Sequence, residues 1–236
     1  MFNPKPKRHL IPLHDGHVCL VFDGVLLDPQ AWIDTAIAHR ARFVEGAWNA
    51  YPGPELPLAA EVTDRLCDFF AQHARAALGA RRTQRAHSRF ALVTRAPETL
   101  APCQRFCHRD RLSSEPGTVI AASVLYLFDR PELGGTSFYR PARPTAEIEA
   151  LVQDSVSLPP EAFNARYPDI APGYMREGNP WFEHIATVPP RFNRLIVYRG
   201  DLFHSGDIAR PDLLSADPAL GRLTVNGFFT CRAALG

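Results

Sequence analysis

The stretch Gln104-Arg105-Phe106-Cys107-His108-Arg109-Asp110 ends in a His-x-Asp motif. Alternate side chains of an extended strand point to the same face. The spacing therefore predicts one shared face for four of these residues: Gln104, Phe106, His108 and Asp110. An adjacent imidazole and carboxylate are two ligands of a 2-His-1-carboxylate iron site, provided that a second histidine comes from elsewhere in the chain. A strand-end histidine that hydrogen-bonds its neighbour fits the same spacing.

A second histidine follows a strong strand pattern late in the chain. Residues 194–199 predict a strand closed by Gly200-Asp201, and His204 comes soon after that turn. A final strand is predicted over residues 222–229. Alternation gives three of its residues a common face: Arg222, Thr224 and Asn226. The chain thus presents a His-x-Asp motif, a later histidine and a basic residue on a last strand, in that order.

Size and composition are those of an ordinary globular protein. The chain has 236 residues, of which 46% are hydrophobic and 22% charged, and its formal net charge is +1. This balance predicts neither a nucleic-acid partner nor an anionic membrane surface. The chain lacks an apolar run of 18 residues, which excludes a transmembrane helix. Five scattered cysteines without a C-x-x-C pair favour free thiols in a reducing cytoplasm.

The remaining patterns predict helices followed by strands. One helix is expected from Asp28-Pro29 to Ala47, and a second over Ala59–Leu78 with Gly79 at its end. The expected strands are 18–22, 89–94, 118–128 and 136–140, with a short helix over 145–152. Two helices packed on antiparallel strands, in a single domain over residues 1–236, are the expected architecture.

Three other segments receive their own interpretations. The basic N-terminus, Met1–Arg8, is expected to be a loose arm, because no apolar segment follows it as in a signal peptide. The basic residues 80–85 are expected to be solvated at the end of a helix. Residues 159–190 are rich in Pro, Gly and aromatic residues with little periodicity, which predicts either a flap over the site or a packed surface excursion.

The order of these motifs resembles that of 2-oxoglutarate- and Fe(II)-dependent oxygenases, and prolyl-hydroxylase-like members look most similar. The motifs that carry the resemblance lie between residues 104 and 229: His108-Arg109-Asp110, Leu125-Tyr126-Leu127, Gly134-Gly135-Thr136, Gly200-Asp201-Leu202-Phe203-His204 and Arg222-Leu223-Thr224. The resemblance implies an α+β fold with a double-stranded β-helix (jelly-roll, cupin-like) core and N-terminal buttressing helices.

The resemblance also implies roles for individual residues. His108, Asp110 and His204 match the ligands of the catalytic Fe(II). Arg222 matches the residue that binds the far carboxylate of 2-oxoglutarate, with Thr224 and Tyr126 as assisting hydroxyls. The implied reaction consumes O2 and 2-oxoglutarate, releases succinate and CO2, and hydroxylates a C–H bond of a small molecule, amino acid or peptide side chain. Because Asp110 fills the carboxylate position, hydroxylation is favoured over halogenation.

Several alternatives stay open on the sequence alone. The same triad could hold zinc for hydrolysis, a scheme in which Arg222 and Tyr126 have no role, or serve a non-catalytic β-helix binding module. The spacing from His204 to Arg222 is longer than is usual in the family, so Arg210 and Arg232 compete with Arg222 as the carboxylate anchor. Three other arginines are candidates for holding an anionic substrate group: Arg109, Arg111 and Arg140.

Overall fold

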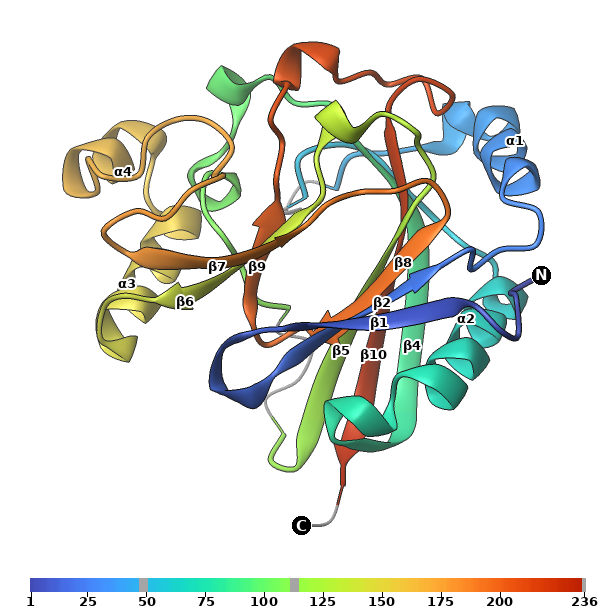
Figure 1. Ribbon diagram of the computed structural model, residues 1–236. Coiled ribbons are helices and arrows are strands. Elements are labelled where there is room, and N and C mark those ends of the chain that lie inside the picture. The colour runs from blue at the N-terminus through green and yellow to red at the C-terminus, as the bar shows by residue number, and fades with distance from the viewer. Residues whose placement is uncertain (47–50, 111–114, 235–236) are drawn as a thin grey trace.

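The fold is given by a computed structural model that describes residues 1–46, 51–110 and 115–234. Within these residues the strands form two antiparallel sheets (Figure 1). The larger sheet has the order β1 (Lys7–Pro12), β2 (Val18–Asp23), β8 (Arg194–Arg199), β5 (Thr118–Tyr126), β10 (Arg222–Ala233), β4 (Ala80–Val93) and β3 (Glu55–Pro57). The smaller sheet has the order β7 (Phe182–Val188), β6 (Thr136–Pro141) and β9 (Phe203–Gly206).

Helices flank the two sheets on opposite sides of the molecule (Figure 1). The helices α1 (Gln30–Ala38) and α2 (Ala60–His73) lie beside the larger sheet, whereas α3 (Thr145–Ser157) and α4 (Pro160–Arg166) lie beside the smaller one. α2 is amphipathic and buries Leu66, Phe69 and Phe70 against the sheet. The predicted arrangement of two N-terminal helices on antiparallel strands is confirmed. Each helix among the described residues is too short or too polar to cross a lipid bilayer.

Three apolar clusters hold these layers together. The largest lies between the larger sheet and the helices α1 and α2. The second lies on the opposite face of that sheet, toward β6, and contains Tyr126, Phe138 and Tyr198. The third lies under α3 and α4 and contains Phe106, Tyr139 and Phe203. The last two clusters border the space between the sheets, so the side chains that point into that space are held from both sides.

Most predicted strands are confirmed, but their lengths differ from the prediction. β4 begins at Ala80 rather than at Arg89, so residues 80–85 are the first residues of a strand and not an irregular segment after a helix. They pair with the end of β10; Arg85, for example, lies opposite Thr230. Backbone pairing with a distant strand decides the structure of this segment, and the charged side chains remain exposed at the edge.

Two N-terminal predictions are wrong. The basic segment Met1–Arg8 is not a loose arm: the ring of Phe2 packs on those of Trp32 and Phe69, and β1, which begins at Lys7, pairs with β2 along its whole length. α1 ends at Ala38, where His39 leaves the helical conformation, and a short turn of 3-10 helix follows. Ala47, the predicted helix end, lies outside the described residues.

The prediction of an irregular segment over residues 159–190 is wrong where α4 and β7 form. α4 and β7 lie within it, and Phe163, Tyr167 and Phe182 are buried in the third cluster. The packed alternative therefore describes these parts. The loop between α4 and β7 brings Tyr174 and Met175 to the lining of a cavity between the sheets.

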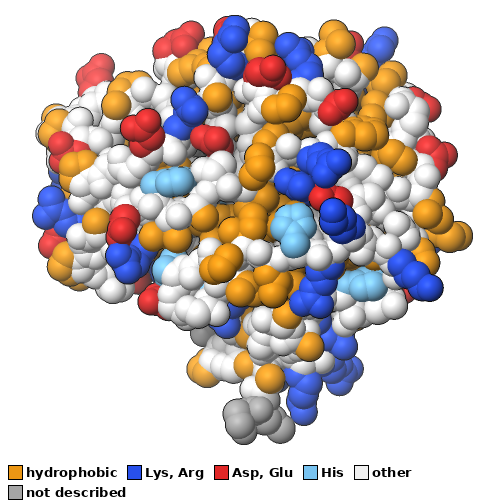
Figure 2. All heavy atoms as spheres, in the orientation of Figure 1, with side chains coloured by type: hydrophobic (Ala, Val, Ile, Leu, Met, Phe, Trp, Pro, Cys, Tyr) orange, Lys and Arg blue, Asp and Glu red, His pale blue; other side chains and the backbone are white. Residues whose placement is uncertain are grey.

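Surface charge follows the near-neutral composition. On the face shown in Figure 2, acidic and basic side chains are interspersed with hydrophobic ones over most of the surface. Lys and Arg side chains gather toward the lower end of that face, where β4 begins and β10 ends in Figure 1.

The turn before β6 requires glycine because the backbone comes very close to another segment there. Gly134 has φ +80°, and a Cβ at this position would lie 1.6 Å from the carbonyl oxygen of Asp207. Gly24 has a similar φ of +69°, but a Cβ there would meet no heavy atom within 4 Å. Gly134 thus combines a backbone conformation that is almost restricted to glycine (φ +80°, ψ 152°) with steric overlap, whereas Gly24 has a positive φ without overlap.

We expect Gly134→Ala to lower the free energy of unfolding by about 3 kcal/mol or more, because left-handed strain and overpacking add. Gly24→Ala should cost about 1 kcal/mol, from left-handed strain alone. Urea unfolding followed by circular dichroism measures both. Equal losses in the two variants would contradict the close approach at Gly134.

Candidate metal centre and its cavity

Two reciprocal backbone hydrogen bonds place His108 and His204 directly opposite each other. The amide of His108 donates to the carbonyl oxygen of His204 at 2.9 Å, and the amide of His204 donates back to His108 at 2.9 Å. Residues paired in this way across an antiparallel ladder project their side chains to the same face. The two imidazole rings accordingly lie 4.5 Å apart between centroids.

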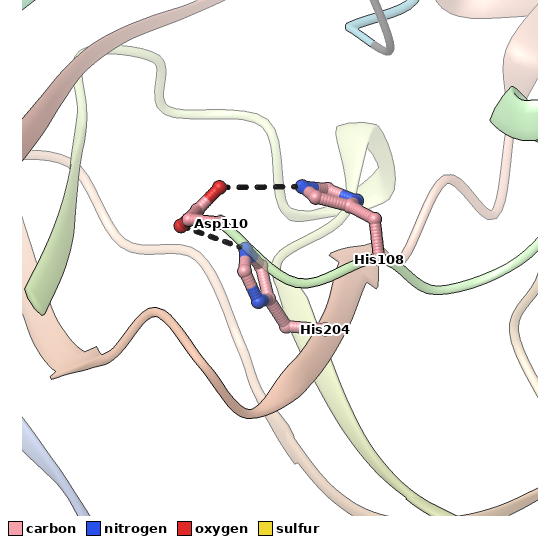
Figure 3. A group of neighbouring side chains, drawn as sticks. All are labelled: His108, Asp110 and His204. Carbon is pink, nitrogen blue, oxygen red and sulfur yellow. Dashed lines mark ion pairs between the residues drawn. The ribbon is translucent and has the colours of Figure 1, made fainter. Parts of the chain in front are cut away.

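Asp110 lies on the same segment as His108, and its carboxylate is close to both histidines. Its amide donates to the carbonyl oxygen of Gly200 at 2.7 Å, and its carboxylate lies between the ends of the two rings (Figure 3). Oδ1 is 3.8 Å from Nε2 of His108, and Oδ2 is 3.6 Å from Nε2 of His204. A Cβ on Gly200 would lie 2.9 Å from Oδ2 of Asp110, so the small residue makes room for the carboxylate.

The donor atoms of these three residues fit a metal ion. One ligand atom from each of His108, Asp110 and His204 lies within 4.8 Å of the others. Oδ2 of Asp110 is buried and has no hydrogen-bond partner among the described residues, which is costly for a carboxylate unless a cation binds it. Nδ1 of His204 lies 2.9 Å from the carbonyl oxygen of Leu202 and must donate to it, which leaves the Nε2 lone pair for a metal.

Burial sets the protonation of the three ligands. Burial lowers the pKa of His204 to about 4, and burial and the neighbouring His204 lower that of His108 to about 4, against the effect of Asp110. Because the His108 side chain is 42% exposed and that of His204 only 6%, water offsets part of the effect at His108. Burial raises the pKa of Asp110, although His108 and Arg89 oppose the rise. Both imidazoles are therefore neutral, as metal ligands must be.

The triad opens into a cavity of about 550 Å³ that Arg222 also lines. Nε of Arg222 donates to the carbonyl oxygen of Gly134 at 3.0 Å, and Nη2 donates to that of Gly135 at 2.7 Å. The guanidinium carbon is 5.9 Å from the ring centroid of Tyr126 and 5.7 Å from that of Phe128. Arg222 is thus a buried cation in a fixed position.

The two predicted hydroxyl groups lie beside Arg222 but not on the cavity lining. The hydroxyl of Tyr126 is 2.8 Å from Oγ1 of Thr136, and it is Thr136 that lines the cavity. The hydroxyl of Thr224 donates to the carbonyl oxygen of Ala91 at 3.4 Å. Gln104 lines the cavity as well, but it lies in a 3-10 turn rather than in the predicted extended strand.

The competing arginines are placed elsewhere. Arg210 pairs with Asp212 at the surface, and Arg232 is exposed near the end of β10. Arg140 is also a surface residue, paired with Glu183, and Arg111 lies outside the described residues. Arg109 lines the cavity, with its guanidinium carbon 4.6 Å above the ring of Phe203.

Sequence reasoning did not identify some residues of the cavity wall. Tyr198 packs its ring edge-on to that of His204, with centroids 4.7 Å apart. Arg89 on β4 and Tyr51 line the cavity from the larger sheet and the segment that precedes β3. Alternation along residues 89–94 could have placed Arg89 on the face opposite Phe90, but not beside the triad, since that position depends on the pairing of β4 with β10.

Comparison with known proteins places the chain in a family and finds similar solved structures. Residues 4–229 match the model of a family of unknown function, DUF6445, and the chain belongs to this family. No curated protein sequence matches the chain. A prolyl-4-hydroxylase from Pseudomonas putida is similar over 93% of this chain and 94% of its own, with 18% identity and a TM-score of 0.47.

Two further solved structures are similar to this chain. HygX from Streptomyces hygroscopicus, with nickel and 2-oxoglutarate bound, is similar over 91% of this chain and 82% of its own, with 11% identity and a TM-score of 0.48. The epimerase SnoN from nogalamycin biosynthesis, in complex with Fe3+ and alpha ketoglutarate, is similar over 90% of this chain and 78% of its own, with 15% identity and a TM-score of 0.47. These proteins belong to the class that the sequence resembles.

We expect divalent metal to stabilise the protein through the triad. Ni(II) at one hundred times its dissociation constant should raise the free energy of unfolding by about 2.7 kcal/mol. His204→Ala should abolish this gain, whereas His184→Ala, which removes an exposed histidine of β7, should leave it unchanged. Thermal unfolding with and without Ni(II) measures the effect. An undiminished gain in His204→Ala would rule out the triad as the site.

Metal affinity should depend only weakly on pH. Two ordinary histidines with a pKa of about 6.5 would lose about 100-fold in affinity between pH 7.5 and 5.5, because both would become protonated. With the pKa of both ligands lowered to about 4, neutral imidazoles persist in this range. The affinity should then fall by less than about tenfold, with protonation of Asp110 as the remaining cause. Calorimetric titration with Ni(II) at both pH values distinguishes the two outcomes.

Proposed function

We propose that the protein is a 2-oxoglutarate- and Fe(II)-dependent dioxygenase that hydroxylates a C–H bond of a small molecule, amino acid or peptide side chain and releases succinate and CO2. The observation that carries the proposal is the convergence of His108, Asp110 and His204 in one cavity with Arg222. Three protein ligands leave coordination positions for a chelating cosubstrate and for O2, which is the arrangement of non-haem iron oxygenases.

The three ligands have distinct tasks in this proposal. His108, Asp110 and His204 would hold Fe(II), which supplies the activation of O2 when bound. The His204 ring is oriented by its bond to Leu202, and the Asp110 carboxylate is positioned by the backbone pairing to Gly200. The chain therefore presents neutral imidazoles and one negative charge to the ion, and protein groups already orient two of the ligands.

Arg222 would bind the far carboxylate of 2-oxoglutarate. A guanidinium forms charge-assisted hydrogen bonds with a carboxylate, and these are strong where water is excluded. Backbone carbonyls and two aromatic rings already fix its orientation, so little side-chain entropy is lost on binding. In the proposal Thr224 and Tyr126 assist the binding of this carboxylate from behind the cavity lining, Tyr126 through its hydrogen bond to Thr136.

The fold and the cell compartment complete the proposal. The two facing antiparallel sheets support the proposal of a distorted double-stranded β-helix within a single domain over residues 1–236. The five cysteines are unpaired, which fits a reducing compartment such as the cytoplasm.

The diagnostic experiment uses the weak visible absorption band that develops when 2-oxoglutarate chelates Fe(II) without oxygen. We expect the wild-type chain to show this band, and His204→Ala to lack it. Arg222→Met should still bind Fe(II) but require at least 100-fold more 2-oxoglutarate, because a buried charge-assisted contact is lost. Anaerobic titration followed by absorbance measures the affinity.

Matched variants test whether the effect belongs to Arg222. Arg210→Met removes an exposed arginine that pairs with Asp212 at the surface and should leave the titration unchanged. Arg222→Lys keeps the charge and should have an intermediate affinity. A wild-type chain that binds Fe(II) without producing the band would contradict the dioxygenase assignment.

A further inference from the structure

The cavity contains a second fixed cation at a distance from Arg222. Arg89 on β4 lies directly opposite Asn226 on β10, four residues along that strand from Arg222. At the rise of an antiparallel strand, this separation is about 13 Å. Both arginines and the triad line the same cavity. A single cosubstrate carboxylate needs one of these cations, and the other is available for a different ligand.

Arg89 is held in place by an aromatic ring and a carboxylate. Its guanidinium carbon is 4.7 Å from the ring centroid of Phe228, whose ring also stacks on His87 at 4.8 Å. Nε lies 2.6 Å from Oε1 of Glu55. Glu55 is the more buried partner, with 12% of its side chain exposed against 27% for Arg89, and only Arg89 lines the cavity. Glu55 thus orients the guanidinium from behind.

Asn226 provides a polar group beside this cation. It is 7% exposed and lines the cavity, and its Oδ1 is buried without a hydrogen-bond partner among the described residues. Buried side-chain amides are normally hydrogen-bonded, so this group has an unmet need that a ligand can satisfy. A ligand that meets both residues carries an anion for Arg89 and an adjacent N–H or O–H for Asn226.

The third arginine of the cavity is less suited to this role. Arg109 also lines the cavity, between the two ligands His108 and Asp110 in sequence. Its guanidinium packs on Phe203, in the third apolar cluster. Arg85 continues the face of Arg89 and His87 along β4, but it is exposed and does not line the cavity.

We propose that Arg89 and Asn226 form the substrate-recognition subsite and that the substrate carries a carboxylate or phosphate group next to a hydrogen-bond donor. The assignment of the other cation, Arg222, to 2-oxoglutarate rests on the proposed function. The substrate then lies between Arg89 and the metal ligands, with its anionic end away from the reacting carbon. A neutral substrate would offer no negatively charged group to Arg89.

The test measures anion preference directly, without turnover. Calorimetric titrations use the Ni(II)- and 2-oxoglutarate-loaded protein and two matched probe pairs, N-benzoylglycine with its neutral amide, and phenyl phosphate with phenol. We expect wild type to bind the anionic member of at least one pair at least tenfold more tightly than its neutral partner. The pair that shows the larger ratio identifies the anion as carboxylate or phosphate.

Variants test which arginine produces the preference for anionic probes. Arg89→Gln should reduce the ratio to below about threefold and leave 2-oxoglutarate affinity within about threefold of wild type, whereas Arg89→Lys should retain part of the ratio. Arg85→Gln removes the same charge from the same face outside the cavity and should keep the full ratio. The thermal unfolding of each variant shows whether it is folded.

Any of these results in the probe titrations would overturn the proposal: equal binding of anionic and neutral probes by wild type, a ratio that survives in Arg89→Gln, or a ratio abolished by Arg109→Gln instead. Loss of 2-oxoglutarate affinity in Arg89→Gln to the extent seen for Arg222→Met would equally overturn it, since Arg89 would then hold the cosubstrate. If Ni(II) and 2-oxoglutarate fail to bind at all, the proposed function fails. The same probe titrations on the metal-free chain still decide the role of Arg89.

Discussion

The paired backbone amides and carbonyls of His108 and His204 are the interaction on which the site depends. Two hydrogen bonds of 2.9 Å join segments that are far apart in the chain, and they determine that both imidazoles project to one side. The bond from Asp110 to Gly200, which precedes His204 by four residues, fixes the end of the same segment and brings the carboxylate to the rings. The relative positions of the three donors are therefore set by the main chain, and the side chains need only adopt suitable rotamers.

This short ladder stays in place because aromatic packing supports it from the side of the smaller sheet. Phe106, two residues before His108, stacks on Phe182 of β7 with ring centroids 5.9 Å apart, and Phe182 contacts Phe203 beside His204. The segment between α3 and β7, which looks irregular in sequence, supplies the partners of these rings. Its aromatic residues thus contribute to the site mainly as structure, by fixing the strands that carry the ligands.

The sequence carries enough information to predict the order of the motifs, because each depends on local patterns. The apolar runs around residues 118–126 and 194–199 and the turn at Gly134-Gly135 are all where the periodicity predicts them. Predictions failed where distant pairing overrides local preference. Local patterns predict a solvated segment at the charged start of β4, but its structure depends on pairing with β10. They likewise predict a loose arm at the N-terminus, where β1 pairs with β2. Arg89 was missed for the same reason, since only the register of β4 and β10 brings it near the triad.

The surroundings of Arg89 and Arg222 show how one cavity can hold two cations, each in a fixed position. Each guanidinium lies near an aromatic ring, and each has oxygen atoms of the protein beside it: Arg222 donates hydrogen bonds to two carbonyl oxygens, and Arg89 forms an ion pair with the Glu55 carboxylate. Lysine could not fully replace either arginine, because its ammonium group is a compact point charge and lacks the planar fork of donors of a guanidinium.

The protein groups beside the two arginines differ in charge. Neutral carbonyls leave the full positive charge of Arg222 to a ligand, which fits the proposed role of this residue in binding the cosubstrate. Glu55 lowers the net charge at Arg89, so a ligand held there depends more on its other contacts, including Asn226. Discrimination between anionic ligands then comes from those contacts, as a substrate site requires.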